Sequence, residues 1–236
     1  MLGLSLGTTI KSNPSGIFQL SDVSGLQIWL RKASFITFDQ HGVSKWEDIS
    51  GNNNDATQSS NGKKPSYEDG NGDEVIFDGH NDSLNFNTEL NLGAFTICLV
   101  VNPDESHTLL NESPIGRAGN DQIKMYRGGS SSRIALKANS VQSDINPMTA
   151  SFPTSQFLLT CIREASGKFK VRINKSEVGN VATDVTDLFD ITQIGSGGIS
   201  TTEFGGSINE VAVFNLELTG VELNNVETNI SNRNAI

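Results

Sequence analysis

Two stretches of sequence decide the fold. The first is Trp46-Glu47-Asp48-Ile49-Ser50-Gly51-Asn52-Asn53-Asn54-Asp55-Ala56, which leads to Phe77-Asp78-Gly79. The second is Phe204-Gly205-Gly206-Ser207-Ile208-Asn209-Glu210-Val211-Ala212-Val213-Phe214-Asn215. Asn and Asp tolerate a left-handed backbone and bond to their own turns, so residues 50–55 predict a compact corner. Residues 210–214 have the length and apolar content that predict a core strand.

Between these stretches, short apolar runs alternate with clusters of Gly, Asn, Asp and Ser, a spacing typical of a β-sandwich. The clearest run, residues 168–174, places three apolar side chains on one face and three basic ones on the other. One buried and one wet face indicate an antiparallel sheet. The predicted strands are residues 26–30, 74–77, 83–86, 95–101, 123–126, 134–136, 157–162, 168–174 and 210–214.

One helix is predicted, and it lies at the C-terminus. Thr219 has the position of an N-cap and Glu222 that of the reciprocal partner, which together predict a capping box. Leu218 and Leu223 have the spacing of a hydrophobic staple around that cap. Apolar residues continue at helical spacing to Ile230. We expect a short helix held by tertiary packing rather than by propensity.

Composition excludes several classes of function. The chain has 236 residues, of which 36% are hydrophobic, and its longest apolar run is of strand length, so we expect a soluble protein that enters no membrane. The formal net charge of -10 argues against a nucleic-acid partner and against adsorption to anionic lipid. Neutral glycans and protein partners are compatible with this charge.

Cysteine and histidine usage gives no metal or disulfide framework. Cys98 and Cys161 both lie in apolar runs, so we expect buried, free thiols. The three histidines are scattered and do not supply a zinc site. The N-terminus lacks the basic start and continuous apolar core of a signal peptide, so synthesis in the cytoplasm without classical export is expected.

In their order and spacing, these elements resemble the laminin-G-like, concanavalin-A-like jelly rolls, particularly the version found as one domain of bacteriophage virion proteins. In such domains an early Leu-Trp-Leu-like triplet, here Ile28-Trp29-Leu30, precedes the Trp46 block. The resemblance covers residues 23–236. It implies an all-β fold, a two-sheet antiparallel jelly-roll sandwich with a short C-terminal helix.

Residues 1–22 have the character of an N-terminal arm outside the sandwich. Glycines and the Asn13-Pro14 pair break any period, yet the segment is too apolar for a freely solvated tail. Such an arm docks on a partner or packs on its own domain. The candidate partner-binding residues are Leu2, Leu4, Leu6, Ile10, Ile17 and Phe18.

Catalysis is not expected. Sugar-cleaving relatives of this architecture carry Glu-x-Asp-x-x-Glu on one strand, so that alternation places the carboxylates on the same face. Glu47-Asp48 and Asp73-Glu74 are adjacent pairs, which a strand would direct to opposite faces. Tyr67 and Tyr126, the only tyrosines, fit no lyase motif. The sequence therefore predicts a protein that is not an enzyme.

Two oxygen-rich loops are calcium candidates. Asp48, Ser50, Asn52 and Asn54 place oxygen-bearing side chains at alternate positions, like the start of an EF-hand loop, but the bidentate Glu that such a loop requires is missing. Residues 69–73 have the same deficiency, with Asp69, Asn71 and Asp73 as the candidate ligands. Turn chemistry is the alternative for both loops, and no other cofactor is indicated.

A basic stripe, Lys168, Lys170 and Arg172, offers a surface for an acidic glycan or an acidic partner. A solvated sheet face is the alternative interpretation. Trp29 and Trp46 are flanked by core-like residues, so we expect them to be buried rather than to stack on a sugar.

The resemblance favours a non-enzymatic phage virion protein, either a capsid decoration or a tail or fibre component, anchored by its N-terminal arm. Its partners would then be other virion proteins and further copies of itself as a homo-oligomer, and its location the virion, after synthesis in the host cytoplasm. The alternative is a carbohydrate-binding module or adhesin that recognises a host surface glycan.

Overall fold

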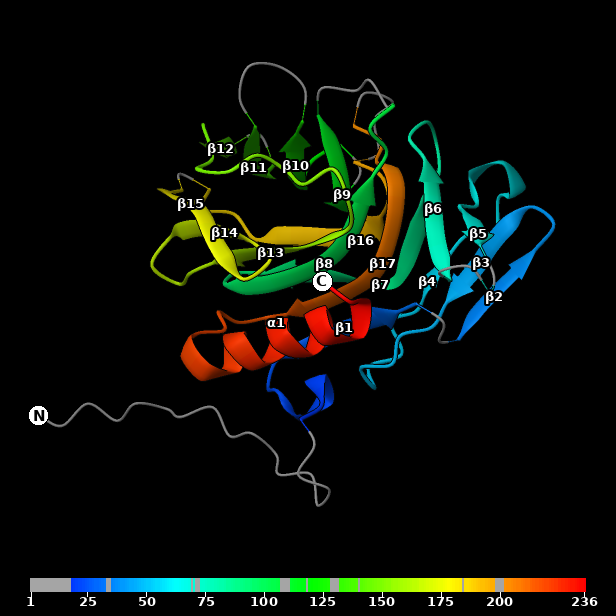
Figure 1. The fold of residues 1–236 in the computed structure, drawn as a ribbon, viewed down its shortest axis with the longest axis horizontal. Helices are drawn as coiled ribbons and strands as arrows, with labels where there is room; N and C mark the ends of the chain where they lie inside the picture. Colours follow the sequence, from blue (N-terminus) through cyan, green and yellow to red (C-terminus); the bar gives the residue numbers. More distant parts are fainter. Residues whose placement is uncertain are drawn as a thin grey trace, which may run out of the picture.

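The computed structural model describes residues 18–32, 35–68, 70, 73–106, 111–117, 119–127, 132–139, 141–183, 185–197 and 202–236. They form two antiparallel β-sheets packed face to face, with one α-helix, α1 (Gly220–Asn234), on the outside (Figure 1). The predicted all-β, two-sheet antiparallel sandwich with a C-terminal helix is confirmed.

The helix-bearing sheet, called sheet A, is ordered β15 (Ser176–Ala182), β14 (Lys168–Ile173), β13 (Phe157–Arg163), β8 (Phe95–Pro103), β17 (Gly205–Phe214), β6 (Glu74–Asp78) and β5 (Ser66–Glu68). The strand β1 (Leu26–Arg31) pairs with β17 beside this path. Short 3-10 turns, η1 (Leu20–Asp22) and η2 (Asn61–Lys63), precede β1 and β5.

The second sheet, called sheet B, is ordered β12 (Val141–Ile145), β11 (Arg133–Ala138), β10 (Gln122–Tyr126), β9 (Glu112–Gly116), β16 (Phe189–Ile194), β7 (Leu84–Leu92), β4 (Ala56–Thr57), β3 (Gly42–Trp46) and β2 (Ile36–Asp39). Among the described residues, no α-helix covers its outer face (Figure 1).

Two apolar clusters hold these layers together. The larger fills the space between the sheets and includes Trp46, Phe95 and Phe189, all fully buried. The smaller lies between sheet A and α1 and includes Trp29 and Phe214. Burial of such side chains is the main favourable term in folding, about 25 cal/mol per Å² of apolar surface. The expected burial of both tryptophans is confirmed.

The predicted strands all occur, with shifted ends. The run predicted at 83–86 continues to Leu92 as β7, and the alternation of β14 is confirmed, with Phe169, Val171 and Ile173 buried. Cys98 and Cys161 are buried and free, as predicted. The strands that the sequence patterns did not predict are β2, β3, β4, β5, β9, β12, β15 and β16.

The helix α1 is confirmed, but the predicted capping box is wrong. Thr219 occupies the N-cap position without a capping bond from its side chain, and Glu222 Oε1 finds no hydrogen-bond partner in the described structure. Gly220, the first helical residue, has a left-handed φ of 54°, which takes the cap out of capping-box geometry. Instead, the Leu218 amide donates to Thr96 Oγ1 of β8 at 2.8 Å, and this bond fixes the entry to the helix.

No helix in the part of the chain that the structure describes combines the length and the apolar character needed to cross a bilayer.

Candidate functional site

The basic stripe on β14 takes part in ion pairs within the fold. Arg172 donates to both carboxylate oxygens of Glu227 on α1, with Nε to Oε1 at 2.8 Å and Nη2 to Oε2 at 3.0 Å. Lys170 pairs with Glu164, and its Nζ lies 3.9 Å from Glu217 Oε1. Lys170 and Arg172 thus have ion-pair partners within the protein itself.

The first calcium candidate is a hydrogen-bonded turn. Asp48 Oδ1 accepts from the amides of Trp29 and Ser50, both at 2.9 Å, and Oδ2 accepts from the Asn54 amide at 3.0 Å. The Asn52 side chain donates to the backbone carbonyls of Leu26 and Gln27 at the start of β1, and the Asn54 side chain bonds to the Thr88 backbone in both directions. These oxygens and amides build the corner that the sequence predicts.

In the second candidate loop, Asp69 and Asn71 lie outside the described residues. Asp73 Oδ1 accepts from Tyr67 Oη at 3.3 Å and from the Gly70 amide at 3.2 Å. Over the described ranges, acidic, His and Cys side chains form no group of three that could hold a metal ion.

Most of the predicted arm also lies outside the described residues. Leu2, Leu4, Leu6, Ile10 and Ile17 fall there, whereas Phe18 packs against the cluster beneath α1 and its carbonyl accepts from Asn229 Nδ2. Leu20 and Val23 are buried in the same cluster. Residues 18–23 therefore pack on the sandwich itself.

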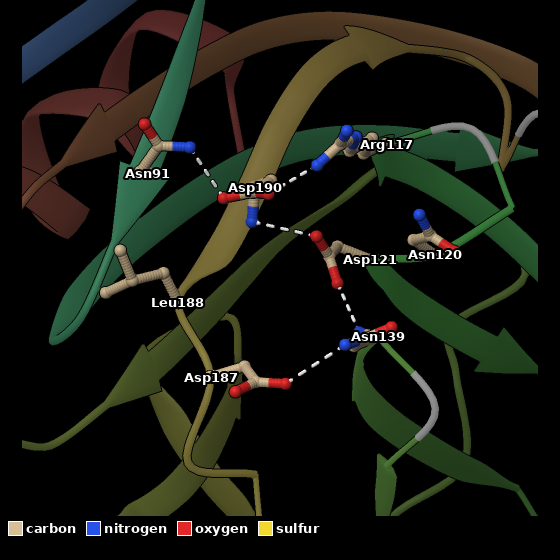
Figure 2. Close-up of a pocket in the computed structure, with 8 residues that line it drawn as sticks. All are labelled: Asn91, Arg117, Asn120, Asp121, Asn139, Asp187, Leu188 and Asp190. Atoms are coloured by element: carbon tan, nitrogen blue, oxygen red, sulfur yellow. Dashed lines mark hydrogen bonds and ion pairs between the residues drawn. The ribbon is translucent and has the colours of Figure 1, made fainter.

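A polar hollow at one end of sheet B is the strongest candidate site. We call it the Asp190 pocket; it has a volume of about 500 Å³. It lies where β7 ends, β16 begins, and the β9–β10 and β11–β12 turns approach (Figure 2). The described lining residues are Asn91, Arg117, Asn120, Asp121, Asn139, Asp187, Leu188 and Asp190.

Asp190 is the centre of this pocket (Figure 2). Its Oδ2 pairs with Arg117 Nη1 at 2.6 Å, and its Oδ1 accepts from Asn91 Nδ2 at 2.7 Å. Arg117 also lies 3.3 Å from Glu89 Oε1, and its side chain is 40% exposed. A cation, an anion and an amide are thus held together at a surface that solvent still reaches.

Asp121 joins the three segments of the pocket. Its Oδ1 accepts from the Asn139 amide at 2.5 Å and its Oδ2 from the Asp190 amide at 3.2 Å. Burial raises the pKa of Asp121, the nearby Asp190 carboxylate adds to the rise, and the two backbone donors oppose it. We assign Asp121 a positioning role, because it bonds to backbone rather than facing solvent.

The backbone around Arg117 depends on a glycine. A Cβ on Gly116 would lie 2.0 Å from the Asp121 carbonyl oxygen, so only glycine permits this close approach of β9 to β10. The Arg117 amide then donates to that same carbonyl at 2.6 Å. On the facing turn, Asn139 adopts a left-handed φ of 54°, a conformation that Asn tolerates.

The wall of the pocket opposite Arg117 carries both polar and apolar side chains. Asn139 Nδ2 donates to Asp187 Oδ2 at 3.2 Å, and the adjacent Leu188 is 54% exposed. Figure 2 shows these side chains across the hollow from Arg117. Hydroxyl groups both donate and accept, so a ring with several of them can bond to carboxylates, amides and guanidinium together. Leu188 can cover an apolar face of such a ring.

None of these residues was among the candidate ligands that the sequence suggested. In the sequence these residues are mostly single Asn and Asp residues scattered along the chain, which turn chemistry explains equally well. The grouping arises only when β16 pairs between β7 and β9, which brings Asp190 opposite Asn91.

Several solved structures share this fold. Domain 4 of AbnA, an extracellular arabinanase from Geobacillus stearothermophilus, solved in complex with arabinotriose, has a TM-score of 0.59 at 20% identity, over 82% of this chain and 94% of that chain. Trypanosoma rangeli sialidase has a TM-score of 0.58 at 17% identity, over 97% of this chain and 36% of that chain.

A structure of botulinum neurotoxin type C, whose cell entry is described as dependent on two ganglioside molecules, has a TM-score of 0.60 at 14% identity. The match covers 89% of this chain and 52% of that chain, so this chain spans only about half of it. No family model matches the sequence, and no curated protein does. At such low identities, the structural likeness establishes the fold alone. This fold is a concanavalin-A-like, lectin-like β-sandwich, as the sequence resemblance implied.

Proposed function

We propose that this protein is a carbohydrate-binding module that holds a glycan in the Asp190 pocket. The observation that carries the proposal is the lining of this hollow, in which seven polar side chains surround one exposed leucine. The exposed Arg117 and Leu188 side chains leave the hollow accessible to a chain of sugars from solvent.

The chemistry of the lining suits sugar hydroxyls better than other ligands. Arg117 and Asn91 donate while Asp190 and Asp187 accept, so neighbouring hydroxyls find partners of both kinds. A polyanion is disfavoured, because three aspartates line the hollow and the chain carries a net charge of -10. A large apolar ligand is disfavoured as well, because Leu188 is the one apolar side chain in the described lining.

The structural neighbours support the same class of ligand. One is a domain solved with arabinotriose bound, and another is a toxin whose entry into cells depends on gangliosides. Because their identities with this chain are low, they support a glycan as the class of ligand and carry no residue assignment.

A glycan array followed by titration calorimetry with the best ligand tests the proposal. Leu188→Ala and Arg117→Ala should each weaken binding about tenfold, the loss expected when one good contact in a small site is removed. Val221→Ala is the matched control, because Val221 is also an exposed apolar residue, at 71%, but lies on α1. The absence of any glycan ligand would overturn the function; unchanged affinity in both variants would overturn the site.

The virion role stays a second proposal. It rests on the sequence resemblance and on the apolar character of residues 1–22, and it is compatible with glycan recognition by a tail or fibre component. That the protein is non-enzymatic also stays a prediction: incubation with the glycan it binds should release neither reducing ends nor unsaturated products.

A further inference from the structure

A second polar hollow lies on the same face as the Asp190 pocket, at the other end of the β7–β16 pair. We call it the Glu203 pocket; it has a volume of about 360 Å³. In the β7–β16 register, Asn91 faces Asp190 at the first pocket and Asn85 faces Gln193 at the second. Asn85 and Asn91 are both exposed, and the register shift places their partners Gln193 and Asp190 only three residues apart in β16, a separation of about 10 Å along that strand.

The walls of this pocket are polar side chains that are withdrawn from solvent. Gln58, Ser83, Gln193 and Ser196 are all at least nine-tenths buried, although they lie outside the apolar clusters. Gln58 Nε2 donates to the Ser83 carbonyl and Gln193 Nε2 to the Ser196 carbonyl, both at 2.9 Å. These bonds hold the wall side chains in fixed positions.

Two acceptor atoms in the lining have no partner. Glu203 is 6% exposed, and its Oε2 forms no hydrogen bond in the described structure; the same holds for Asn81 Oδ1. Burial raises the pKa of Glu203, a Ser196 hydrogen bond opposes the rise, and the Asp78 carboxylate adds to it. A buried acceptor without a donor destabilises a fold, so such atoms beside a hollow indicate a ligand that supplies donors.

The rim supplies a donor. Lys63 is exposed, lines the pocket, and lies close enough for its charge to lower the pKa of Glu203. The nearby Asp78 and Asp82 are not free to hold a cation, because Asp78 Oδ1 accepts from the His80 and Asn81 amides and Asp82 Oδ2 from the Asp78 amide. The pocket therefore presents unpartnered acceptors with a lysine donor at its rim.

We propose that the Glu203 pocket is a second glycan subsite, which holds a neutral sugar ring through hydroxyls that donate to Glu203 Oε2 and Asn81 Oδ1 and accept from Lys63. It rests on the proposed function for the class of ligand, and it is independent of the Asp190 pocket in its residues. One face of the sandwich would then hold two parts of the same oligosaccharide.

Nuclear magnetic resonance titration of the full chain separates the two pockets. The probes are arabinotriose, maltotriose and cellotriose, and the reporters are the side-chain amides of Gln58 and Gln193 for this pocket and of Asn91 and Asn139 for the first. At least one probe should shift both sets. Glu203→Gln should weaken the binding seen by Gln58 and Gln193 about tenfold, because it replaces an acceptor by a donor.

Stability of the free protein distinguishes a binding role from a structural one. Glu203→Gln removes a buried carboxylate whose Oε2 lacks a partner, so its Tm should be equal to or above that of the unaltered protein. A lowered Tm would mean that Glu203 supports the fold, and would overturn the subsite. Asn81→Ala should repeat the loss of binding, with Asn87→Ala on β7 as the matched control.

The remaining outcomes are distinct. Shifts confined to Asn91 and Asn139 would overturn the second subsite and leave the proposed function standing. Shifts confined to Gln58 and Gln193 would support the subsite and remove the Asp190 pocket. No shift in either set with all three probes would overturn both.

Discussion

Asp82 is a buried carboxylate behind the Glu203 pocket, and its surroundings oppose ionisation. Burial is the main reason that its pKa rises from 3.8 to about 7, and the Asp78 carboxylate adds to the rise. The Asp78 amide, which donates to Asp82 Oδ2 at 3.0 Å, opposes it. One side chain thus links the stability of the sandwich to pH.

Whether stability rises or falls with pH depends on which state, folded or unfolded, binds more protons at Asp82. Between about pH 4 and about pH 7 the folded state keeps a proton on Asp82 that the unfolded chain has lost, so stability falls as pH rises through this window. Each pH unit contributes about 1.4 kcal/mol, for a total on the order of 4 kcal/mol. Asp82→Asn should remove this part of the slope, since Asn still accepts from the Asp78 amide.

Urea unfolding of the unaltered protein and of Asp82→Asn between about pH 4 and about pH 7 measures how the unfolding free energy of each depends on pH. Glu203 and Asp121 also have raised pKa values and act in the same direction, so the comparison with Asp82→Asn, rather than the slope of the unaltered protein, is the test. Parallel curves for the two proteins would show that Asp82 ionises normally.

At the residue scale, the sequence predicts local structure correctly where hydrogen-bond partners lie close together in the chain. Asp48 bonds to Ser50 and Asn54, a few positions away, so turn chemistry alone predicted the corner. Asp190 bonds to Arg117 and Asn91, which are 73 and 99 positions away. No local pattern contains that pairing, and the pocket therefore appears only in the folded chain.

At the scale of the element, Arg172 holds α1 on sheet A. Glu227 is fully buried, and Arg172 donates to both of its carboxylate oxygens. Arg172→Ala would leave that carboxylate buried and unpaired, which should cost about 3–5 kcal/mol of unfolding free energy. Lys168→Ala on the same strand is the control, expected to change it by less than about 0.5 kcal/mol.

The double variant Arg172→Met, Glu227→Leu separates the pair from the helix packing. Replacing both charges by apolar groups of similar size should recover most of the loss, because no buried charge then remains unpaired. Urea unfolding of all four proteins checks this. A loss for the double variant as large as for Arg172→Ala would show that packing of the long side chain, and not charge, holds the helix.

Two of the strands that the sequence did not predict contain loop-forming residues or an interrupted apolar alternation. The strand β9 reads Glu-Ser-Pro-Ile-Gly, and its Pro114 and Gly116 suggest a loop, yet all five residues are buried. Its Glu112 is tolerated there because it pairs with Arg127 at 2.8 Å. In β16 a register shift between Ile191 and Gln193 interrupts the alternation. Both strands form the Asp190 pocket, so the site and the missed elements coincide.

At the scale of the whole molecule, the two outer faces of the sandwich differ in what covers them. The outer face of sheet A is covered by α1, the cluster around Trp29 and the ion pairs of β14. The residues that line both polar pockets come mostly from the strands of sheet B and the loops that join them. The basic stripe, for which the sequence left a ligand surface and a solvated sheet face as alternatives, lies on the side that α1 covers, where Lys170 and Arg172 form ion pairs.

The positions of the two apolar clusters predict the effect of removing residues 1–17. Residues 18–236 contain both apolar clusters, including Phe18 and Leu20 beneath α1, so the chain cut after residue 17 should keep its Tm and its glycan affinity. If residues 1–22 form a docking arm, the truncated chain should lose attachment to purified particles from the source, measured by co-sedimentation. Attachment undiminished by the cut would end the arm hypothesis, whereas loss of attachment with binding intact would assign anchoring to the N-terminus and recognition to sheet B.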